Sequence, residues 1–138
     1  MSIFVDSSAW YAVADAGDAS HERAVALLDQ FSGDLVTSDH VLIETWFLAS
    51  GRESSAAGDR LVERIRKGLA RVEPAGLADL EVAAEIGRAF PDQDFSIVDR
   101  TSWSIMERLG IHRAVAFDVD FFIYRFGPDR RQAFTVYT

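Results

Sequence analysis

The sequence predicts an α/β fold with three layers, α/β/α, in which helices cover both faces of a central parallel sheet of four to five strands. Short runs of β-branched and aromatic residues alternate along the chain with longer amphipathic segments. Parallel strands need crossover connections, and helices of this length provide them. The chain has 138 residues and no internal repeat, so we expect one domain over residues 1–138.

The first half of the chain is predicted to supply two strands and four helices. "IFV" at 3–5 and "DLVTS" at 34–38 have the composition of short strands. The segment 39–50 is apolar almost all round and precedes Gly51, so we expect a buried helix that ends at a left-handed glycine. The other helices are expected after a hydroxyl N-cap at Ser7 or Ser8, over 18–31, and over 53–68.

The second half is predicted to continue this alternation as far as a strand at the sheet edge. Ser96 is a suitable N-cap and Gly110 a suitable stop for one helix, and Pro91 closes another. The expected elements are a strand at 69–74, helices at 77–90 and 96–110, a strand at 113–118, a helical turn at 119–124 and an edge strand at 133–138. In such sheets ligands bind outside the carboxyl ends of the strands.

Composition excludes several classes of site. The chain has no cysteine, which rules out disulfides, thiolate zinc sites and cysteine nucleophiles. Its net charge of -8 opposes long-range attraction to nucleic acid, so contact with phosphate would need a bound cation. No apolar stretch approaches the roughly 20 residues of a membrane span, and we expect a cytoplasmic protein that binds no membrane.

Four acidic residues stand where the predicted fold brings elements together. Asp6 and Asp118 each follow a strand, so both are expected at the carboxyl edge of the sheet. Glu44 is the only charged residue in the apolar segment 41–49, and a carboxylate without a partner on an apolar face is costly. Asp99 lies about one turn into its helix, where the helix N-terminus favours negative charge.

Asp6, Glu44, Asp99 and Asp118 are therefore predicted to converge on one cleft, as metal ligands and as catalytic groups. Hard oxygen ligands of this kind suit Mg²⁺ or Mn²⁺. A bound ion would let an acidic protein approach a phosphodiester, would activate a water and would stabilise the leaving oxygen. The pattern indicates metal-assisted phosphodiester hydrolysis.

Each member of this set also has a simpler structural interpretation. The three aspartates suit helix caps, turns or the first turn of a helix, where acidic side chains are common. Glu44 could be neutralised by a buried arginine, with Arg64 and Arg66 as candidates. Asp94 and Asp120 are reserve ligands, each expected to be solvated or capping.

Hydroxyl and imidazole groups near the acids are assigned lesser roles. Ser7, Ser8 and Thr101 could orient a ligand or a metal-bound water, although N-capping is the expected role of either serine. The histidines have no metal-ligand spacing and are expected at the surface or in packing; they are His21, His40 and His112. The tryptophans are expected in the core; they are Trp10, Trp46 and Trp103.

"IFVDSSAWYA", "SDHVLIETWFL", "DFSIVDRTSWSIM" and "RAVAFDVDF" occur in this order and span nearly the whole chain. Together they resemble a PIN domain, specifically the VapC-type toxin ribonucleases of bacterial toxin–antitoxin pairs. The resemblance implies a Rossmann-like fold and Mg²⁺- or Mn²⁺-dependent cleavage of RNA. It also implies a homodimer and a cognate VapB-type antitoxin, whose C-terminal segment lies across the acidic cleft.

By position in this resemblance, Asp6 matches the strand-end acid of the family, Glu44 its helix glutamate, Asp99 its third acid and Asp118 its more variable fourth acid. Val98 and Arg100 depart from the pattern, which commonly has threonine before the third acid and a small residue after it. A helical rotation of about 100° per residue lets Arg100 face RNA or solvent instead of the acids.

Other functions fit the chain less well. A response-regulator receiver needs paired acids after the first strand and a lysine near the last, and an aspartyl-nucleophile phosphatase needs two acids two residues apart. "VDSSA" supplies one acid, and the single lysine, Lys67, is in the middle of the chain. The alternative from another class is a catalytically inactive PIN-like module that binds RNA or protein, which cleavage assays with Mg²⁺ and with a chelator would distinguish.

Overall fold

The computed structural model describes all 138 residues and has a five-stranded parallel sheet at its centre. The strand order is β3-β2-β1-β4-β5. The strands are β1 (Ile3–Val5), β2 (Leu35–Ser38), β3 (Arg71–Glu73), β4 (Arg113–Val115) and β5 (Thr135–Tyr137). Every predicted strand is present, and the last one lies at an edge as expected.

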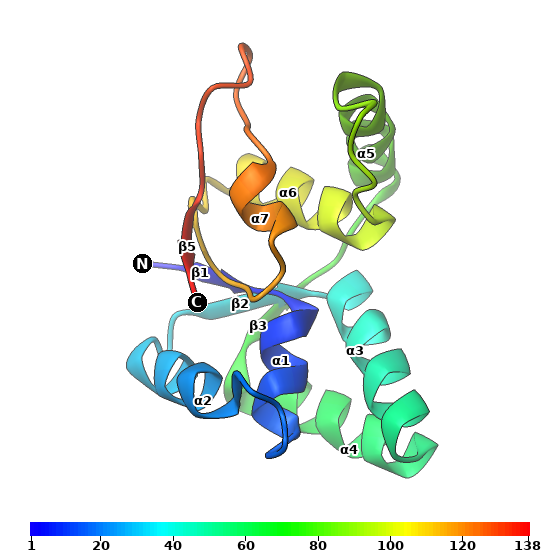
Figure 1. Cartoon of the computed structure of the whole chain (residues 1–138), viewed down its shortest axis with the longest axis vertical. Helices are drawn as coiled ribbons and strands as arrows, with labels where there is room; N and C mark the ends of the chain where they lie inside the picture. Colours follow the sequence, from blue (N-terminus) through cyan, green and yellow to red (C-terminus); the bar gives the residue numbers. More distant parts are fainter.

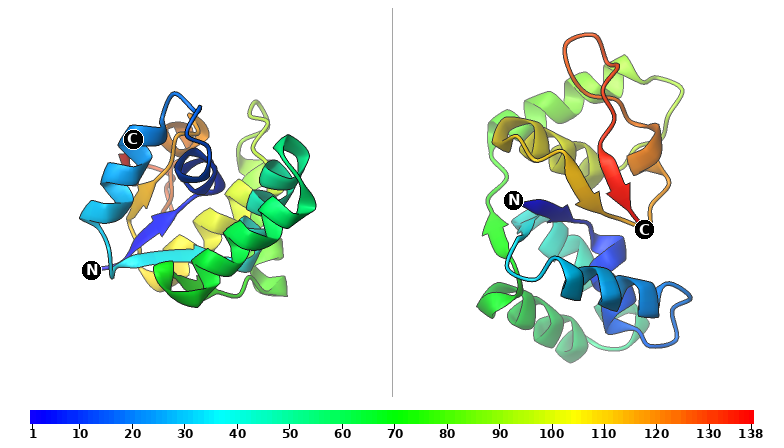
Figure 2. Two further views of the ribbon diagram at one scale, coloured as in Figure 1. Left: turned by 90° about the horizontal axis from the view of Figure 1, so that it is seen from below. Right: turned by 90° about the vertical axis from the view of Figure 1, so that its left-hand side faces the viewer.

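Helices cover both faces of this sheet. They are α1 (Ser7–Ala14), α2 (His21–Gln30), α3 (Asp39–Arg52), α4 (Ser55–Arg64) with a π-helical turn η1 (Ile65–Leu69), α5 (Leu77–Ala89), α6 (Ile97–Leu109) and α7 (Asp120–Ile123). Figures 1 and 2 show α5 and α6 on one side of the strands and α1, α2 and α4 on the other. The predicted three-layer α/β/α architecture is confirmed. None of the helices is both long enough and apolar enough to cross a membrane.

The position of β1 in the middle of the sheet determines which chain segments meet. All three residues of β1 are fully buried, as expected for a parallel strand that is covered on both faces. Phe4 pairs with Val36 of β2 on one side and with Ala114 of β4 on the other. The carboxyl ends of β1 and β4 are therefore adjacent, and the backbone N–H of Asp6 donates to the carbonyl of Val115 at 3.0 Å.

The two ends of α6 confirm the predictions, and the start of α1 corrects one. Ser96 caps α6 by accepting from the N–H of Asp99 at 3.1 Å, and Gly110 ends this helix in the left-handed conformation. The predicted serine cap of α1 is wrong. Asp6 caps this helix instead and accepts from the backbone N–H of Ser8 at 3.2 Å, because the carboxylate precedes the serines at the end of β1.

Helix α3 differs from its prediction in two ways. It continues to Arg52, so Gly51 lies inside the helix and is not left-handed. It is also not buried all round, because Ile43, Phe47 and Leu48 are exposed, Phe47 to 64%. The helix leaves the carboxyl edge of the sheet (Figure 1), and only its other faces pack against α1, α4 and α6. An apolar strip of α3 is therefore left at the surface.

The core around α6 is rich in packed aromatic rings. Trp103 and Tyr124 are stacked with 4.2 Å between their ring centroids, and Phe95 meets Trp103 edge-on. Trp10 is also buried, whereas Trp46 is half-buried, so two of the three tryptophans belong to the core as predicted. This packing fixes α6, the helix that carries Asp99.

One buried carboxylate in this layer is fully satisfied by neighbouring groups of the chain. Asp79 in α5 accepts from Ser104 Oγ at 2.8 Å and from the N–H of Gly76 at 2.9 Å. It also accepts from Arg108, through Nε at 3.0 Å and Nη2 at 3.2 Å. Burial alone would raise the pKa of Asp79, but these hydrogen bonds hold it below its ordinary value. The cluster joins α5 to α6.

Candidate active site

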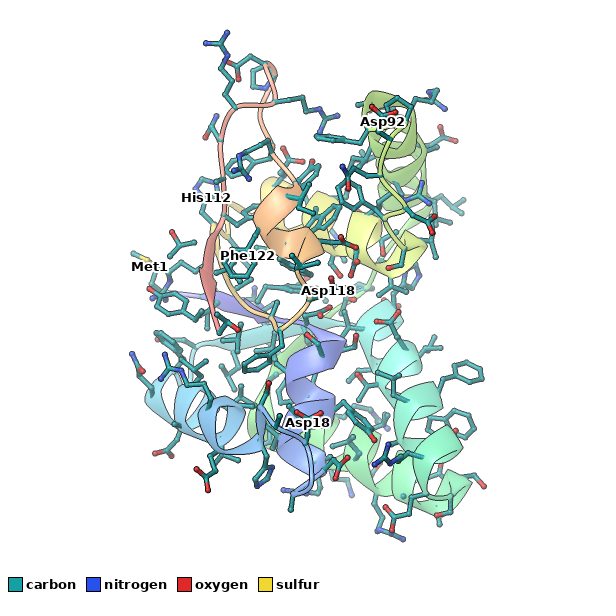
Figure 3. The ribbon with its side chains drawn as sticks, in the orientation of Figure 1. Met1, Asp18, Asp92, His112, Asp118 and Phe122 are labelled. Atoms are coloured by element: carbon teal, nitrogen blue, oxygen red, sulfur yellow. The ribbon has the colours of Figure 1, made fainter.

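Three carboxylates meet at the carboxyl edge of the sheet. Asp6 follows β1, Asp118 follows β4, and Asp99 lies in the first turn of α6. One oxygen of each lies within 4.8 Å of an oxygen of the other two. In Figure 3 the labelled Asp118 lies near the amino end of α1, where Asp6 is the N-cap. The topology thus brings together three residues that are far apart in the sequence.

Glu44 lies beside this group without belonging to it. Its carboxylate accepts a hydrogen bond from the hydroxyl of Ser7 in α1. After burial, the negative charge of Glu44 is among the causes that raise the pKa of Asp6 and of Asp99. The fourth predicted acid is therefore near enough to interact electrostatically with the other three.

No arginine neutralises Glu44. Arg66 pairs with Glu63 at 3.4 Å. Arg64 lines a separate cavity, which is bounded by α1, α2 and η1. The alternative in which a buried guanidinium compensates Glu44 is wrong, because Arg64 at the end of α4 and Arg66 in η1 both have other surroundings.

Asp6 has one oxygen that the chain satisfies and one that it does not. It is 1% exposed. Its Oδ2 accepts from the hydroxyl of Ser8 at 2.6 Å, whereas its Oδ1 is buried and has no hydrogen-bond partner. Burial raises the pKa of Asp6 to about 6, in spite of the bonds from Ser8. A buried, unpartnered carboxylate oxygen is an arrangement that a cation would satisfy.

Asp99 is buried among like charges. Burial, followed by the negative charges of Asp6, Asp118 and Glu44, raises the pKa of Asp99 well above its ordinary value. No lysine, arginine or N-terminal amine pairs with any of these four acids. A set of carboxylate oxygens with no internal counter-charge fits a hard divalent cation, and suits Mg²⁺ or Mn²⁺ better than softer metals.

The two reserve acids lie outside the group of three. Asp120 is half-buried, and its backbone N–H donates to Oδ1 of Asp118 at 2.9 Å, so Asp118 also caps the turn that follows it. Burial, followed by the charges of Asp118 and Asp94, raises the pKa of Asp120. Asp94 is exposed. The capping interpretation of Asp118 is therefore correct in part. The same carboxylate caps this turn and also lies close to Asp6 and Asp99.

The serines hold the acids instead of capping α1. Ser8 donates its hydroxyl hydrogen to Asp6 and accepts from the backbone N–H of Phe117 at 2.9 Å, so it joins the segments that follow β1 and β4. Ser7 donates to Glu44. Two of the four carboxylates are thus oriented by hydroxyls that immediately follow Asp6 in the sequence.

Arg100 neither enters the acidic group nor extends into solvent. It is half-buried, and its guanidinium donates to the carbonyl of Phe95 at 3.2 Å and to that of Ala83 at 3.1 Å. Gly87 leaves room for this contact, since a Cβ there would lie 2.6 Å from Nη1 of Arg100. Arg100 thus stays out of the acidic group, as the helical rotation allowed, but backbone carbonyls of α5 and of the loop before α6 bind it, so it does not point into solvent.

His40 is a neighbour of the site whose contacts the sequence did not predict. Its Nδ1 lies 3.2 Å from Oγ1 of Thr101 in α6. With Glu44 it lines an open groove of about 390 Å³ between α3 and α6, whose apolar lining residues are Ile43, Phe47, Ile97 and Val98. The spacing of one helical turn between His40 and Glu44 is the sequence signal that places both on one face of α3.

Comparisons with known proteins identify the family of the chain. A profile of the PIN domain matches residues 3–127. The 23S rRNA-specific endonuclease VapC20 of Mycobacterium tuberculosis is 40% identical over 120 residues, which cover 86% of this chain and 91% of that protein. Ribonuclease VapC26 of the same organism is 26% identical over 106 residues, which cover 77% of this chain and 78% of that protein.

A solved structure indicates the same family. The crystal structure of Mycobacterium tuberculosis VapC20, described as a sarcin-ricin loop cleaving toxin, matches with a TM-score of 0.81 at 37% identity. The match covers 86% of this chain and 92% of that chain. The match to the PIN domain includes the positions of all four acids. The chain therefore belongs to the PIN-domain family and, within it, to the VapC-type toxin ribonucleases.

Proposed function

We propose that this chain is a metal-dependent endoribonuclease that acts as the toxin of a VapBC-type toxin–antitoxin system. Its catalytic and metal-ligating residues are Asp6, Glu44, Asp99 and Asp118, and its cofactor is Mg²⁺ or Mn²⁺. The observation that carries the proposal is the meeting of three carboxylates within 4.8 Å of one another, with no cationic side chain paired to them.

In this proposal the acids bind the ion, and two serines orient the acids. Asp6 offers a buried oxygen with no other partner, and Ser8 holds the opposite oxygen in place. Ser7 orients the carboxylate of Glu44. When bound, a divalent ion supplies an activated water for attack on the phosphodiester and charge stabilisation for the leaving oxygen. Without the ion, the acids repel phosphate.

The proposed substrate is RNA, and the first candidate is the sarcin-ricin loop of 23S rRNA. The support is the 40% identity to VapC20 over 86% of this chain. Sequence-specific RNA recognition commonly targets unpaired bases in loops, and such bases can be turned toward a cleft at the edge of a sheet. We accordingly propose that the protein acts in the cytoplasm, where ribosomes are available.

The proposed partners are a cognate VapB-type antitoxin and a second copy of the chain in a homodimer, with residues 1–138 acting as one domain. The support is the family to which the chain belongs. Exposed apolar residues lie beside the acids, and a surface of this kind is commonly covered in an assembly. These residues are Ile43, Phe47 and Leu48 of α3 and Ile97 of α6.

The first experiment incubates ribosomes with the purified chain in Mg²⁺, in Mn²⁺ and in excess chelator. We expect a discrete cut in 23S rRNA with either ion and none with chelator. Millimolar Mn²⁺ is also expected to raise the melting temperature of the protein, because the ion binds the folded chain preferentially. RNA that is bound but left intact in both ions would favour the inactive binding module instead.

Isosteric variants test the assigned residues. Asp6→Asn and Glu44→Gln are each expected to abolish cleavage and to leave the fold intact or more stable, because they remove one of several crowded negative charges. Glu22→Gln, at an exposed position of α2, is the matched control and is expected to cut at the parental rate. Parental cleavage by either site variant would remove that residue from the proposed site.

A further inference from the structure

His40 occupies a defined place beside the acids. It lies in the first turn of α3, is half-buried and precedes Glu44 by one helical turn. Its Nδ1 is 3.2 Å from Oγ1 of Thr101, a fully buried residue of α6 that follows Asp99 by two positions. The contact therefore joins the turn of α3 that precedes Glu44 to the part of α6 that carries Asp99.

The other contact of Thr101 determines the direction of this hydrogen bond. The Thr101 hydroxyl donates to the carbonyl of Val98 at 3.2 Å, which uses its only hydrogen. With that bond in place the hydroxyl accepts from His40, which assigns the hydrogen to Nδ1 of the imidazole. A neutral ring in the Nδ1–H form and a protonated ring both meet this requirement. The bond therefore does not depend on the charge of His40.

No other side-chain hydrogen bond joins α3 to α6. The remaining side-chain polar contacts of α3 with other elements go to α1 and the residue that follows it, to Ser38 of β2, to α4 or to the segment after β3. Beyond His40 the two helices separate, and the open groove begins there. Glu44 and Asp99, two of the proposed ligands, lie on these two helices. A bond at this point opposes the separation of the two acids.

We propose that His40 is a positioning residue for the acidic site. Through Thr101 it holds the helix of Glu44 against the helix of Asp99, and it thereby increases the affinity of the four acids for a divalent cation. This inference rests on the proposed metal-dependent function. It differs from an ordinary packing role because it predicts a loss of metal affinity without a comparable loss of stability.

Two pairs of variants test this role. His40→Asn retains an amide N–H near the position of Nδ1, whereas His40→Gln moves the amide to the position of Nε2. Thr101→Ser retains the hydroxyl, whereas Thr101→Val removes it. Calorimetric titration of the metal-free protein with MnCl₂ is expected to give affinities about tenfold weaker for His40→Gln and Thr101→Val, as is usual when an outer partner of a metal site is lost. His40→Asn and Thr101→Ser are expected to remain close to the parental affinity.

The control is His21→Gln. The Nδ1 of His21 lies 2.8 Å from the carbonyl of Ala12, so the variant loses a comparable bond between α1 and α2, and it is expected to bind Mn²⁺ normally. Parental Mn²⁺ affinity in His40→Gln and Thr101→Val would overturn this inference and leave the proposed function unaffected. Weak binding by His40→Asn, equal to that of His40→Gln, would also overturn it. Absence of Mn²⁺ binding by the parental protein would contradict the proposed function and the inference together.

Discussion

Asp79 and Asp99 are both buried carboxylates, on adjacent packed helices, but their surroundings are opposite. Asp79 accepts hydrogen bonds from Gly76, from Ser104 and twice from Arg108. Asp99 has acids as its charged neighbours, and no guanidinium pairs with it. The pKa of Asp79 is accordingly lowered and that of Asp99 raised.

The difference between the two sites shows how a carboxylate that the chain itself satisfies can be told from a candidate ligand. Burial costs both side chains solvation, and the chain itself compensates this cost at Asp79. At Asp99 the chain supplies no cationic side chain to compensate this cost. An acid whose charge is unfavourable in the folded protein alone is a candidate ligand, and perturbed pKa values of this kind cluster at functional sites.

The largest expected effect comes from Asp99→Asn. We expect RNA cleavage to fall by about a thousandfold or more, equivalent to about 4 kcal/mol, because a proposed metal ligand is lost. The same variant should melt at a higher temperature than the parental protein in chelator, since a buried group with a raised pKa becomes permanently neutral. Single-turnover cleavage and thermal melting provide both readouts. If the variant melted at a lower temperature and cut RNA at the parental rate, Asp99 would be a stabilising residue like Asp79 and not a ligand.

Asp79→Asn is the same substitution with the opposite expectation. Both oxygens of Asp79 accept hydrogen bonds, so an amide NH₂ at either position faces a donor. We expect a loss of about 2 kcal/mol of unfolding free energy, and unchanged cleavage per folded molecule. Urea denaturation measures the first quantity. A stability equal to that of the parental protein would show that Arg108, which is partly exposed, finds equivalent partners in water.

The pH dependence of the metal-free protein is the next test. Asp6 titrates at about 6 in the folded state, above its ordinary value of 3.8, so the folded chain binds more protons than the unfolded chain between these values. Stability in chelator should therefore fall by about 2 kcal/mol as the pH rises from about 4 to 6. Asp79 has a lowered pKa, and its contribution is lost only below this window. The pKa of Asp99 is raised as well, so its contribution to stability also falls across this window. Asp6→Asn should therefore make the profile measured by denaturation shallower without abolishing the fall, and a profile as steep as that of the parental protein would assign the Asp6 share elsewhere.

The smallest expected effect is that of Ser7→Ala. The hydroxyl of Ser7 orients Glu44 without touching the other acids, so its loss should weaken Mn²⁺ binding or slow cleavage by about tenfold. Folding should be little changed, because the N-cap of α1 is Asp6 and not this serine. Ser7→Thr, which keeps a hydroxyl, is the matched control. An effect as large as that of Asp99→Asn would place Ser7 among the ligands themselves.

Much of the fold and the convergence of the acids could be predicted from the sequence, because both depend on local patterns and on one topological rule. Runs such as Ile3–Val5 become buried strands wherever helices cover both faces. Acids that directly follow parallel strands must then lie at one edge, which is where Asp6 and Asp118 meet. Glu44 was predicted to lie beside them because it is the only charged residue of an apolar helical segment, and a carboxylate there needs a cation.

The supporting contacts could not be predicted, because they join segments that are distant in sequence. Ser7 and Glu44 are 37 residues apart, and Ser8 bonds to a backbone N–H 109 residues away. The exposed face of α3 was missed for a related reason: an apolar surface such as that of Phe47 indicates burial, and the monomer leaves it uncovered. A local pattern reports what a side chain prefers, whereas the tertiary structure determines which partner it finds.

The central place of β1 in the sheet also affects how the protein is made. β1 leaves the ribosome before its neighbour β4, which is synthesised more than a hundred residues later. Long-range parallel pairing of this kind forms late in folding. Nascent chains that contain β1 but not β4 hold Asp6 without Asp118, so the three carboxylates cannot meet until β4 has been synthesised.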